Sequence, residues 1–446
     1  MTGLRRNAAF RRFWLASTVS DFGSYLTTVA LSVLVLLTLQ GSALDQGIVS
    51  AGRWAPYLLF GLFAGLWVDR FRRRLVLIAG DLGRGLVLAT TCLLALTGHL
   101  TVPVLVALIF AFGVLSLLGD AASQSFVPQL VPRDSLLRAN YRLQQSETAA
   151  QLGGTALAGA LIAAITAPVA LFLDALSFLF SGAVLLTLSD DDANRRPARA
   201  TTTTGQRIGE GLRFVYTHPR LAPMGIGTPI WFIGSAMLGT ALPALVLLEL
   251  GLGPLWLGLL LGCAGVGSVL GLTTSLPLDR RFGTGRVIIG ARLVQPVAVA
   301  LIALAPMFAS SAGPASTTGL AITTGLVIAP GAAAAVIAVA AGQFLFGFAM
   351  GAEGPLETGY RQAVTPDRLQ ARMSATMRSV NRGMIVVGAP LGGAIAATAG
   401  AAAALWVAAA VMVVAALVLA LSRFRTARIK SDSLGADDDG TCTNAS

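Results

Sequence analysis

Apolar stretches of about 20 residues or more recur along the whole chain, separated by short polar segments. An α-helix that crosses the hydrocarbon core of a bilayer needs about 20 mostly apolar residues. The pattern therefore predicts an all-α polytopic membrane protein with twelve transmembrane helices. We place them at residues 13–39, 46–68, 75–97, 102–124, 138–166, 169–188, 222–249, 255–278, 287–307, 334–357, 371–397 and 401–421. The segment 308–333 is apolar but rich in Gly, Pro, Ser and Thr, and we assign it to a long outer loop.

The basic loop residues lie on one side of this predicted topology. The chain has 32 Lys and Arg, and the loops after even-numbered spans collect them, whereas the loops after odd-numbered spans contain none. Examples are Arg70, Arg72, Arg73 and Arg74, then Arg195, Arg196 and Arg199, then Arg280, Arg281 and Arg286. Cytoplasmic loops are enriched in Lys and Arg. We therefore expect a multi-pass protein of the bacterial cytoplasmic membrane with both termini in the cytoplasm.

Composition agrees with a membrane protein and excludes other classes. The chain is 55% hydrophobic and 12% charged, whereas soluble domains have roughly 25% charged residues. Its net charge of +11 does not indicate a nucleic-acid partner, because the Arg lie in short loops beside apolar spans, where they bind membrane lipids with anionic headgroups. Cys92, Cys263 and Cys442 have no metal-binding or disulfide spacing, so we expect no metal site.

A polar break divides the chain into two halves. We expect a six-helix bundle over 1–188, a cytoplasmic linker over 189–220, a second six-helix bundle over 221–425 and a disordered tail over 426–446. Within the linker, residues 206–217 have the pattern of a short amphipathic helix, which we expect on the inner membrane surface.

The two halves repeat weakly. The loop over 69–74 reads DRFRRR, and the loop over 279–286 reads DRRFGTGR. Residues 158–161 (AGAL) also match 392–395 (GGAI). Such internal repeats are typical of secondary transporters, so the sequence predicts two pseudo-symmetric bundles.

Residues 65–74 (GLWVDRFRRR) resemble the signature between the second and third spans of the major facilitator superfamily. The second copy is degenerate, because Ser275 replaces the glycine. Residues 125–132 (SFVPQLVP), 137–140 (LRAN) and 172–178 (FLDALSF) resemble the branch with the enterobactin exporter and the macrolide and Tap-type multidrug efflux proteins.

The resemblance covers residues 5–425 and implies the major facilitator fold. It also implies a latch that closes one conformation. Its residues would be Gly65, Asp69, Arg70, Arg73, Arg74, Asp279 and Arg280. The alternative is that these arginines only set the topology.

Ionisable residues inside spans point to function, because each is costly in lipid. We expect Asp21 and Glu147 to carry a coupling proton, unless they form structural ion pairs with arginines. The expected substrate cavity comprises Arg53, Arg84, Gln144, Arg378, Asn381 and Arg382. Nearer to span ends, snorkelling or capping is the expected explanation for four further acids. These are Asp120, Asp174, Glu353 and Glu357.

The sequence contains no organised catalytic triad and no phosphate loop, so we expect neither an enzyme nor a cofactor. The resulting hypothesis is a monomeric, proton-coupled antiporter that exports small amphipathic compounds, either drugs or siderophore-like metabolites. An importer or lipid flippase of the same fold, and a non-transporting membrane receptor, remain as alternatives.

Overall fold

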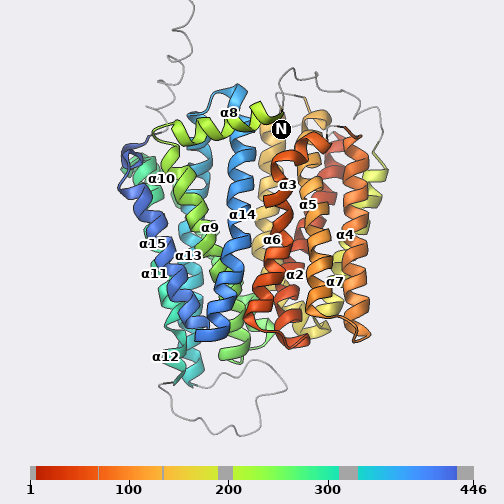
Figure 1. The fold of residues 1–446 in the computed structure, drawn as a ribbon, viewed down its shortest axis with the longest axis vertical. Helices are drawn as coiled ribbons and strands as arrows, with labels where there is room; N and C mark the ends of the chain where they lie inside the picture. Colours follow the sequence, from red (N-terminus) through yellow and green to blue (C-terminus); the bar gives the residue numbers. More distant parts are fainter. Residues whose placement is uncertain (1–6, 69, 133–134, 189–203, 311–329, 429–446) are drawn as a thin grey trace, which may run out of the picture. The chain divides into compact units, whose positions relative to one another are not determined.

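The computed structural model describes residues 7–68, 70–132, 135–188, 204–310 and 330–428. Every regular element in these residues is helical (Figure 1). Four parts of the sequence predictions lie outside them: the latch residue Asp69, linker residues 189–203, residues 311–329 of the expected outer loop, and tail residues 429–446.

Twelve helices in the described ranges have 20 residues or more. They are α2 (Ala8–Val33), α3 (Ala43–Val68), α4 (Arg73–Leu96), α5 (Val102–Leu130), α6 (Leu136–Ile165), α7 (Ala167–Leu186), α9 (Ala222–Ala244), α10 (Pro254–Phe282), α11 (Thr284–Ala303), α13 (Pro330–Ala363), α14 (Asp367–Ala399) and α15 (Ala401–Ala420). By length and hydropathy, eleven of them are apolar enough to cross a membrane, and α3 is the remaining long helix. The predicted all-α polytopic membrane fold is confirmed.

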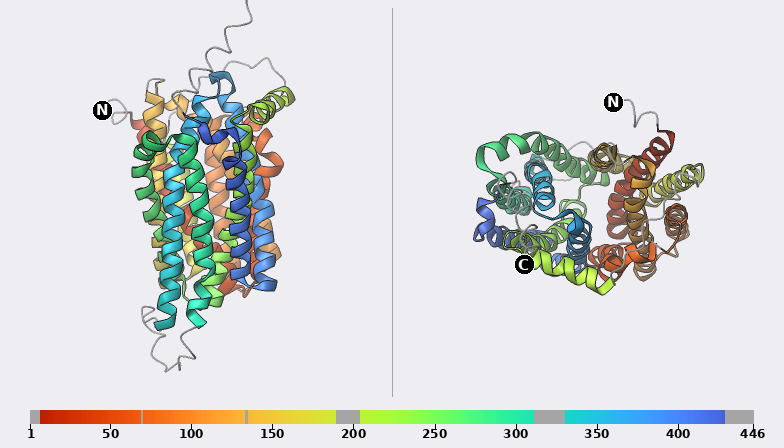
Figure 2. Two further views of the ribbon diagram at one scale, coloured as in Figure 1. Left: turned by 90° about the vertical axis from the view of Figure 1, so that its left-hand side faces the viewer. Right: turned by 90° about the horizontal axis from the view of Figure 1, so that it is seen from above.

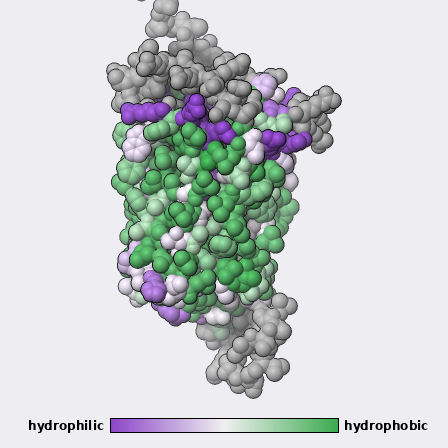
Figure 3. Space-filling model, turned by 90° about the vertical axis from the view of Figure 1, so that its right-hand side faces the viewer, coloured by the Kyte–Doolittle hydropathy of each residue, from purple (hydrophilic) through white to green (hydrophobic). Residues whose placement is uncertain are grey.

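The surface agrees with this fold. On the face drawn in Figure 3, a broad band of hydrophobic side chains covers the middle of the molecule, and hydrophilic residues gather toward its two ends. Such a band matches the apolar thickness that a bilayer presents to a protein.

One compact unit comprises residues 1–201 together with 246–262. In this first unit α2 packs on α6 and α7, α4 packs on α5 and α7, and α3 packs on α5. Small residues permit close approaches: a Cβ added to Gly159 of α6 would lie 2.5 Å from the Gly258 Cα at the start of α10. A substitution there would force these helices apart.

The second compact unit comprises residues 202–245 together with 263–446. Here α9 packs on α14 and α15, and α11 packs on α13 and α15. Gly267 and Gly271 of α10 face Gly347 and Gly351 of α13, and a Cβ added to any of them would lie 2.0 Å or less from a backbone carbonyl oxygen of the opposite helix. These glycines therefore allow the two helices to touch along their backbones.

The amphipathic helix predicted over 206–217 is present as α8 (Thr204–Thr217). It runs across the ends of α9 and α14 and packs on both, and from above it lies lengthwise while the long helices of the same unit are seen end on (Figures 1 and 2). Val215 of α8 is buried against Met373 and Met377 of α14. The apolar side of α8 thus contacts protein along part of its length.

The structure corrects several predicted boundaries. Helix α10 continues to Phe282, so Asp279 and Arg280 lie in a helical turn instead of a loop, and α4 already begins at Arg73. Both ends of the expected outer loop 308–333 are helical, since α12 covers Ala305–Ser310 and α13 starts at Pro330. Helices of membrane proteins commonly extend beyond their apolar core, so hydropathy alone shortens them.

The internal repeat is closer in structure than in sequence. The π-helical turn η1 (Leu34–Thr38) ends the first long helix of one half, and the π-helical turn η4 (Leu245–Glu249) follows α9 in the same way in the other half. Both turns are followed by a residue with positive φ, Gln40 and Gly251. Toward the end of each half, Thr166 and Gly400 also correspond, because each has positive φ between two consecutive helices.

Candidate functional site

Asp21 of α2 lies deep within a predicted span and is partly buried. Glu147, Asp120 and Arg84 are the charged groups within electrostatic range of its carboxylate. No hydrogen bond or ion pair joins Asp21 to any other side chain in the described part of the chain. The structural ion pair with an arginine, which was the alternative for this residue, is therefore not formed in this structure. A carboxylate in this position is costly while it is ionised, and protonation removes that cost.

Glu147 lies on α6 and is exposed in the structure. Gln144, one turn earlier, donates from Nε2 to Glu147 Oε2 at 3.2 Å. The two polar residues that the sequence assigned to proton coupling and to the cavity therefore share one face of α6. Asp21 and Glu147 are brought into electrostatic range of each other, as a common site requires.

Arg53 of α3 is held by a hydroxyl and by two rings. Its Nη1 donates to Thr28 Oγ1 at 3.1 Å, and its guanidinium carbon lies 5.8 Å and 5.5 Å from the ring centroids of Trp54 and Phe112. A cation over an aromatic face is stabilised electrostatically while its polar edge can still donate hydrogen bonds. Arg53 thus combines a positive charge with an aromatic surround.

Arg84 of α4 has a partner that the sequence analysis did not single out. It forms an ion pair with Asp81, one turn earlier on the same helix, and its guanidinium carbon lies 4.4 Å from the Phe178 ring centroid. Asp81 also accepts from Ser181 Oγ at 2.6 Å. Because Asp81 and Arg84 are three residues apart, helical spacing could have identified this pair.

Two acids expected at span ends are part of the interior of the first unit. Asp174 of α7 is fully buried and accepts hydrogen bonds from Thr27 Oγ1 and from Ser177 Oγ, the latter at 2.8 Å. Asp120 of α5 accepts from Tyr57 at 2.9 Å. Snorkelling does not explain Asp174, because its carboxylate contacts the hydroxyl of Thr27 on α2 and that of Ser177 on its own helix, and not solvent.

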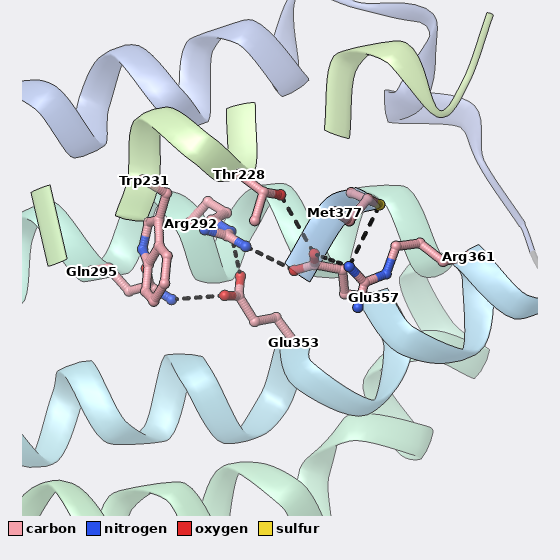
Figure 4. Close-up of polar contacts among 8 residues, drawn as sticks. All are labelled: Thr228, Trp231, Arg292, Gln295, Glu353, Glu357, Arg361 and Met377. Atoms are coloured by element: carbon pink, nitrogen blue, oxygen red, sulfur yellow. Dashed lines mark hydrogen bonds and ion pairs between the residues drawn. The ribbon is translucent and has the colours of Figure 1, made fainter. Parts of the chain in front are cut away.

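The second unit contains a network of charges that is buried except for the partly exposed Arg361 (Figure 4). Arg292 of α11 contacts two carboxylates of α13: its Nε lies 3.0 Å from Glu353 Oε2, and its Nη2 lies 2.7 Å from Glu357 Oε2. Gln295 donates from Nε2 to Glu353 Oε1 at 3.1 Å, and Thr228 of α9 donates to Glu357 Oε1 at 3.4 Å. Both carboxylates are thus shared between an arginine and a neutral donor.

Three further side chains complete this network. The Trp231 ring centroid lies 4.6 Å from the Arg292 guanidinium carbon, and its indole N–H donates to Gln295. Arg361 Nη1 lies 3.6 Å from Glu357 Oε1. The same nitrogen donates to the Met377 sulfur of α14 at 3.7 Å. Two arginines therefore balance two glutamates, and the network links α9, α11, α13 and α14 (Figure 4).

The snorkelling prediction for Glu353 and Glu357 is wrong. Their exposed fractions are 3% and 8%, because α13 continues to Ala363 and places Glu357 more than one turn before the helix end. Their i, i+4 spacing, and the further four residues to Arg361, put all three on one face of α13. In the sequence, this spacing and the single arginine in the ninth predicted span were the features that could have predicted the network.

Arg378 and Arg382 lie one turn apart on α14, as the sequence predicts, and both are partly buried. Asn381 between them is 7% exposed, and its Oδ1 has no hydrogen-bond partner among the described residues. A substrate contact by these three residues stays a prediction.

Two arginines of the predicted latch bind backbone carbonyls of other helices. Arg73 donates to the Ser125 carbonyl of α5 at 3.1 Å, and Arg74 donates to the Leu185 and Leu186 carbonyls of α7 at 3.1 and 2.7 Å. Unpaired carbonyls at a helix C-terminus attract cations, so the Arg74 contacts stabilise the end of α7, whereas Ser125 lies five residues before the end of α5.

The remaining described latch residues lie at helix ends or on the surface. The Asp279 carboxylate accepts from Thr284 Oγ1 at 2.7 Å, at the start of α11. Gly65, Arg70 and Arg280 are exposed, and Asp69 lies outside the described residues. The latch itself stays a prediction.

Comparison with known proteins supports a transporter. The chain matches the family described as "Transmembrane secretion effector" over residues 3–438. It is 26% identical over 210 residues to the uncharacterized MFS-type transporter YfiS of Bacillus subtilis, covering 46% of this chain and 49% of that protein. It is 30% identical over 221 residues to the multidrug efflux pump Tap of Mycobacterium tuberculosis, covering 47% and 52%. The chain thus spans about half the length of the curated relatives that it matches.

Solved structures agree on the fold. A bacterial homologue of the iron transporter ferroportin in an inward-facing state has a TM-score of 0.69 at 16% identity, over 96% of this chain and 100% of that chain. The nucleoside transporter NupG has a TM-score of 0.70 at 12% identity, over 94% and 100%. At such identities the likeness concerns the fold alone. With the family match over almost the whole chain, the protein belongs to the transmembrane secretion effector family of major facilitator transporters.

Proposed function

We propose that this protein is a proton-coupled antiporter that exports small amphipathic compounds across the bacterial cytoplasmic membrane, with both termini in the cytoplasm. It acts as a monomer and not as an enzyme. The relatives named as multidrug efflux pumps support export, and the arginine distribution along the loops supports the orientation.

The observation that carries the proposal is Asp21. This acid lies in the middle of a membrane helix, has no hydrogen-bond or ion-pair partner among the described residues, and is within electrostatic range of Glu147. An acid that is not held by a fixed cation can exchange a proton without dismantling a structural pair. Asp21 is therefore the coupling residue, and Glu147 modulates its proton binding.

The driving force is adequate for export. A membrane potential of about 100 mV supplies roughly 2.3 kcal/mol per charge, and one pH unit adds about 1.4 kcal/mol. Together they sustain roughly a 500-fold gradient of a neutral solute for each proton exchanged.

The residues expected to contact the substrate are a further part of the proposal. Arg53 offers a cation with two aromatic neighbours, and Arg84 offers a cation stacked on Phe178. Such mixed aromatic and cationic surfaces suit amphipathic compounds with acceptor groups. We assign further polar substrate contacts to Gln144 in the first unit and to Arg378, Asn381 and Arg382 in the second.

The proposal is tested by transport in proteoliposomes with an imposed pH gradient, across a panel of amphipathic compounds. Substrate addition to detergent-solubilised wild-type protein should release protons, and Asp21→Asn should abolish both this release and uphill export while substrate binding is retained. Glu210→Gln, which changes an exposed acid of α8, is the matched control and should transport as wild type.

Four outcomes would contradict this proposal. Equal proton release from wild type and Asp21→Asn would exclude Asp21 as the coupling site. Uptake instead of export would favour the importer, and movement of labelled lipid alone would favour the flippase. A receptor would bind compounds without moving them.

The latch is a second part of the proposal. Arg73 and Arg74 donate to backbone carbonyls of α5 and α7 in the first unit, and Asp69 precedes them in the signature loop. A change of one or two kcal/mol in a two-state equilibrium shifts populations by about tenfold. Asp69→Asn should therefore reduce turnover with little loss of expression, and wild-type turnover would leave only the topological role.

The orientation is tested by labelling. Single cysteines at Thr203 and at Ser316, in a background without Cys92, Cys263 and Cys442, should react with an impermeant reagent from opposite sides of the membrane. Labelling of both from the outside would contradict the proposed topology.

A further inference from the structure

A cavity of about 480 Å³ opens between the first turns of α2 and the first half of α6, in the first unit. It is lined by Phe10, Arg11, Trp14, Arg142, Gln145, Ser146 and Ala149. None of these residues takes part in the proposed coupling of proton and substrate. The volume lies within the range of small-molecule sites, roughly 300–1,000 Å³.

Two positive charges line this cavity, and the described residues provide no counter-charge in its lining. The guanidinium groups of Arg11 and Arg142 have no hydrogen bond or ion pair with any described residue, and the lining includes no Asp or Glu. The N–H groups of two such arginines can bind an anion that has several acceptor oxygens. Phosphate is one of the groups that a guanidinium binds through two parallel hydrogen bonds. The cavity therefore has the electrostatics of a phosphate site.

The rest of the lining combines the apolar side chains of Phe10, Trp14 and Ala149 with the polar side chains of Gln145 and Ser146. Phe10 is 1% exposed and belongs to the apolar core of the first unit. The Trp14 indole N–H donates to Ser146 Oγ at 2.8 Å, which fixes the ring against α6. A ligand held here would thus place its charged end at the arginines and an apolar part against Phe10, Trp14 and Ala149.

The position of the cavity indicates that such a ligand comes from the membrane. Arg11 and Trp14 are the fourth and seventh residues of α2, which places them within about 10 Å of the helix end at 1.5 Å rise per residue. Tryptophan and arginine at that depth are typical of the membrane interface, where phospholipid headgroups lie. A bilayer lipid reaches this depth at high local concentration.

From these observations we propose that the cavity between α2 and α6 binds an anionic phospholipid, with its phosphate between Arg11 and Arg142 and the start of its acyl chains against Phe10 and Trp14. The site is separate from Asp21 and does not depend on the transported compound.

The test measures lipid binding to the full-length protein by native mass spectrometry in detergent, with phosphatidylglycerol and phosphatidylcholine as probes. Wild type should bind phosphatidylglycerol more tightly, and Arg11→Gln and Arg142→Gln should each weaken it by about tenfold, the size expected for one charge-assisted contact. Arg213→Gln, an exposed arginine of α8, is the matched control and should leave binding unchanged.

A second pair of variants separates loss of the site from loss of the fold. Arg11→Lys and Arg142→Lys keep the charge and should retain preference for phosphatidylglycerol, and thermal unfolding should match wild type in all variants. Equal phosphatidylglycerol binding by wild type and the Arg11→Gln/Arg142→Gln double variant would overturn the proposal. Dodecyl phosphate and inorganic phosphate serve as soluble competitors: binding of these with no binding of phosphatidylglycerol would assign the cavity to a soluble anion and overturn the lipid assignment.

Discussion

Buried charged residues at corresponding positions of the two units have different ion-pair partners. Asp81 is the ninth residue of α4, and Arg292 is the ninth residue of α11, the corresponding helix of the second unit. Arg84 and Gln295, three residues further along each helix, correspond in the same way. In the first unit the acid pairs with the arginine of its own helix, whereas in the second unit the arginine pairs with two acids of α13.

A single glycine explains part of the difference. When Thr166 is aligned with Gly400, Glu353 of α13 corresponds to Gly119 of α5. A Cβ atom added to Gly119 would lie 3.3 Å from Arg84 Nη2. The first unit therefore has a small residue where the second has a carboxylate, and Arg84 turns to Asp81 and to the Phe178 ring.

The comparison indicates what distinguishes a buried charge with a structural role from one with a functional role. In the second unit each carboxylate of the Arg292 network has a fixed cation and a neutral donor, so that removing one member leaves the others uncompensated. In the first unit Asp21 has neither among the described residues, so a proton can arrive or leave without breaking a network. Four predictions test this distinction, from the largest effect on stability to the smallest.

The largest effect is expected for Glu357→Gln. This change leaves Arg361 and part of Arg292 without a counter-charge, and breaking a buried pair by removing one partner costs about 3–5 kcal/mol. Equilibrium unfolding in mixed detergent and SDS micelles measures the free energy. Thr358→Ala, an exposed neighbour on α13, is the control, and wild-type stability of Glu357→Gln would show that the network does not depend on this charge.

A smaller loss is expected for Asp81→Asn in the first unit. Arg84 keeps its contact with Phe178 and its side chain is 14% exposed, so its charge is less costly than that of Arg292. We expect a loss of about 1–2 kcal/mol, and the Asp81→Asn/Arg84→Gln double variant should lose less than the sum of both single variants. Additive losses in this double-mutant cycle would show that the pair does not interact.

A still smaller effect is expected at the surface of the second unit. Glu210 of α8 and Arg372 of α14 form an ion pair with side chains 49% and 26% exposed. Exposed pairs contribute about 0.2–1 kcal/mol, so Arg372→Gln should cost no more than this, and added salt should remove the difference from wild type. A salt-independent loss above that range would place the pair in a water-excluded site.

The smallest effect on stability is expected for Asp21→Asn, although this variant should lose coupled export. Because Asp21 has no bonded partner among the described residues, its neutral isostere should change the free energy of unfolding by no more than about 0.5 kcal/mol. The same unfolding assay applies, with Glu147→Gln measured in parallel. Strong destabilisation that Arg84→Gln relieves would reinstate the structural ion pair.

Much of the fold could be predicted from the chain, and less of the site. The spans and the amphipathic helix α8 follow from local composition. The shared face of Gln144 and Glu147 follows from helical spacing. The burial of Glu353 and Glu357 was missed because a helix boundary set by hydropathy ended at the second of them, while α13 continues to Ala363.

The amino-acid sequence alone determines the membrane class, the positions of the long helices and the distribution of basic loops. These properties depend on residues close together in the chain, since each span must satisfy its own backbone in lipid. Only the tertiary structure decided which charged residues have partners. Arg292 contacts Glu357, which lies 65 residues later in the chain, and Gln295 contacts Glu353, which lies 58 residues later. Asp21 has no hydrogen-bond or ion-pair partner among the described residues. Partnership between distant residues depends on how helices pack, and hydropathy contains no information about which faces meet.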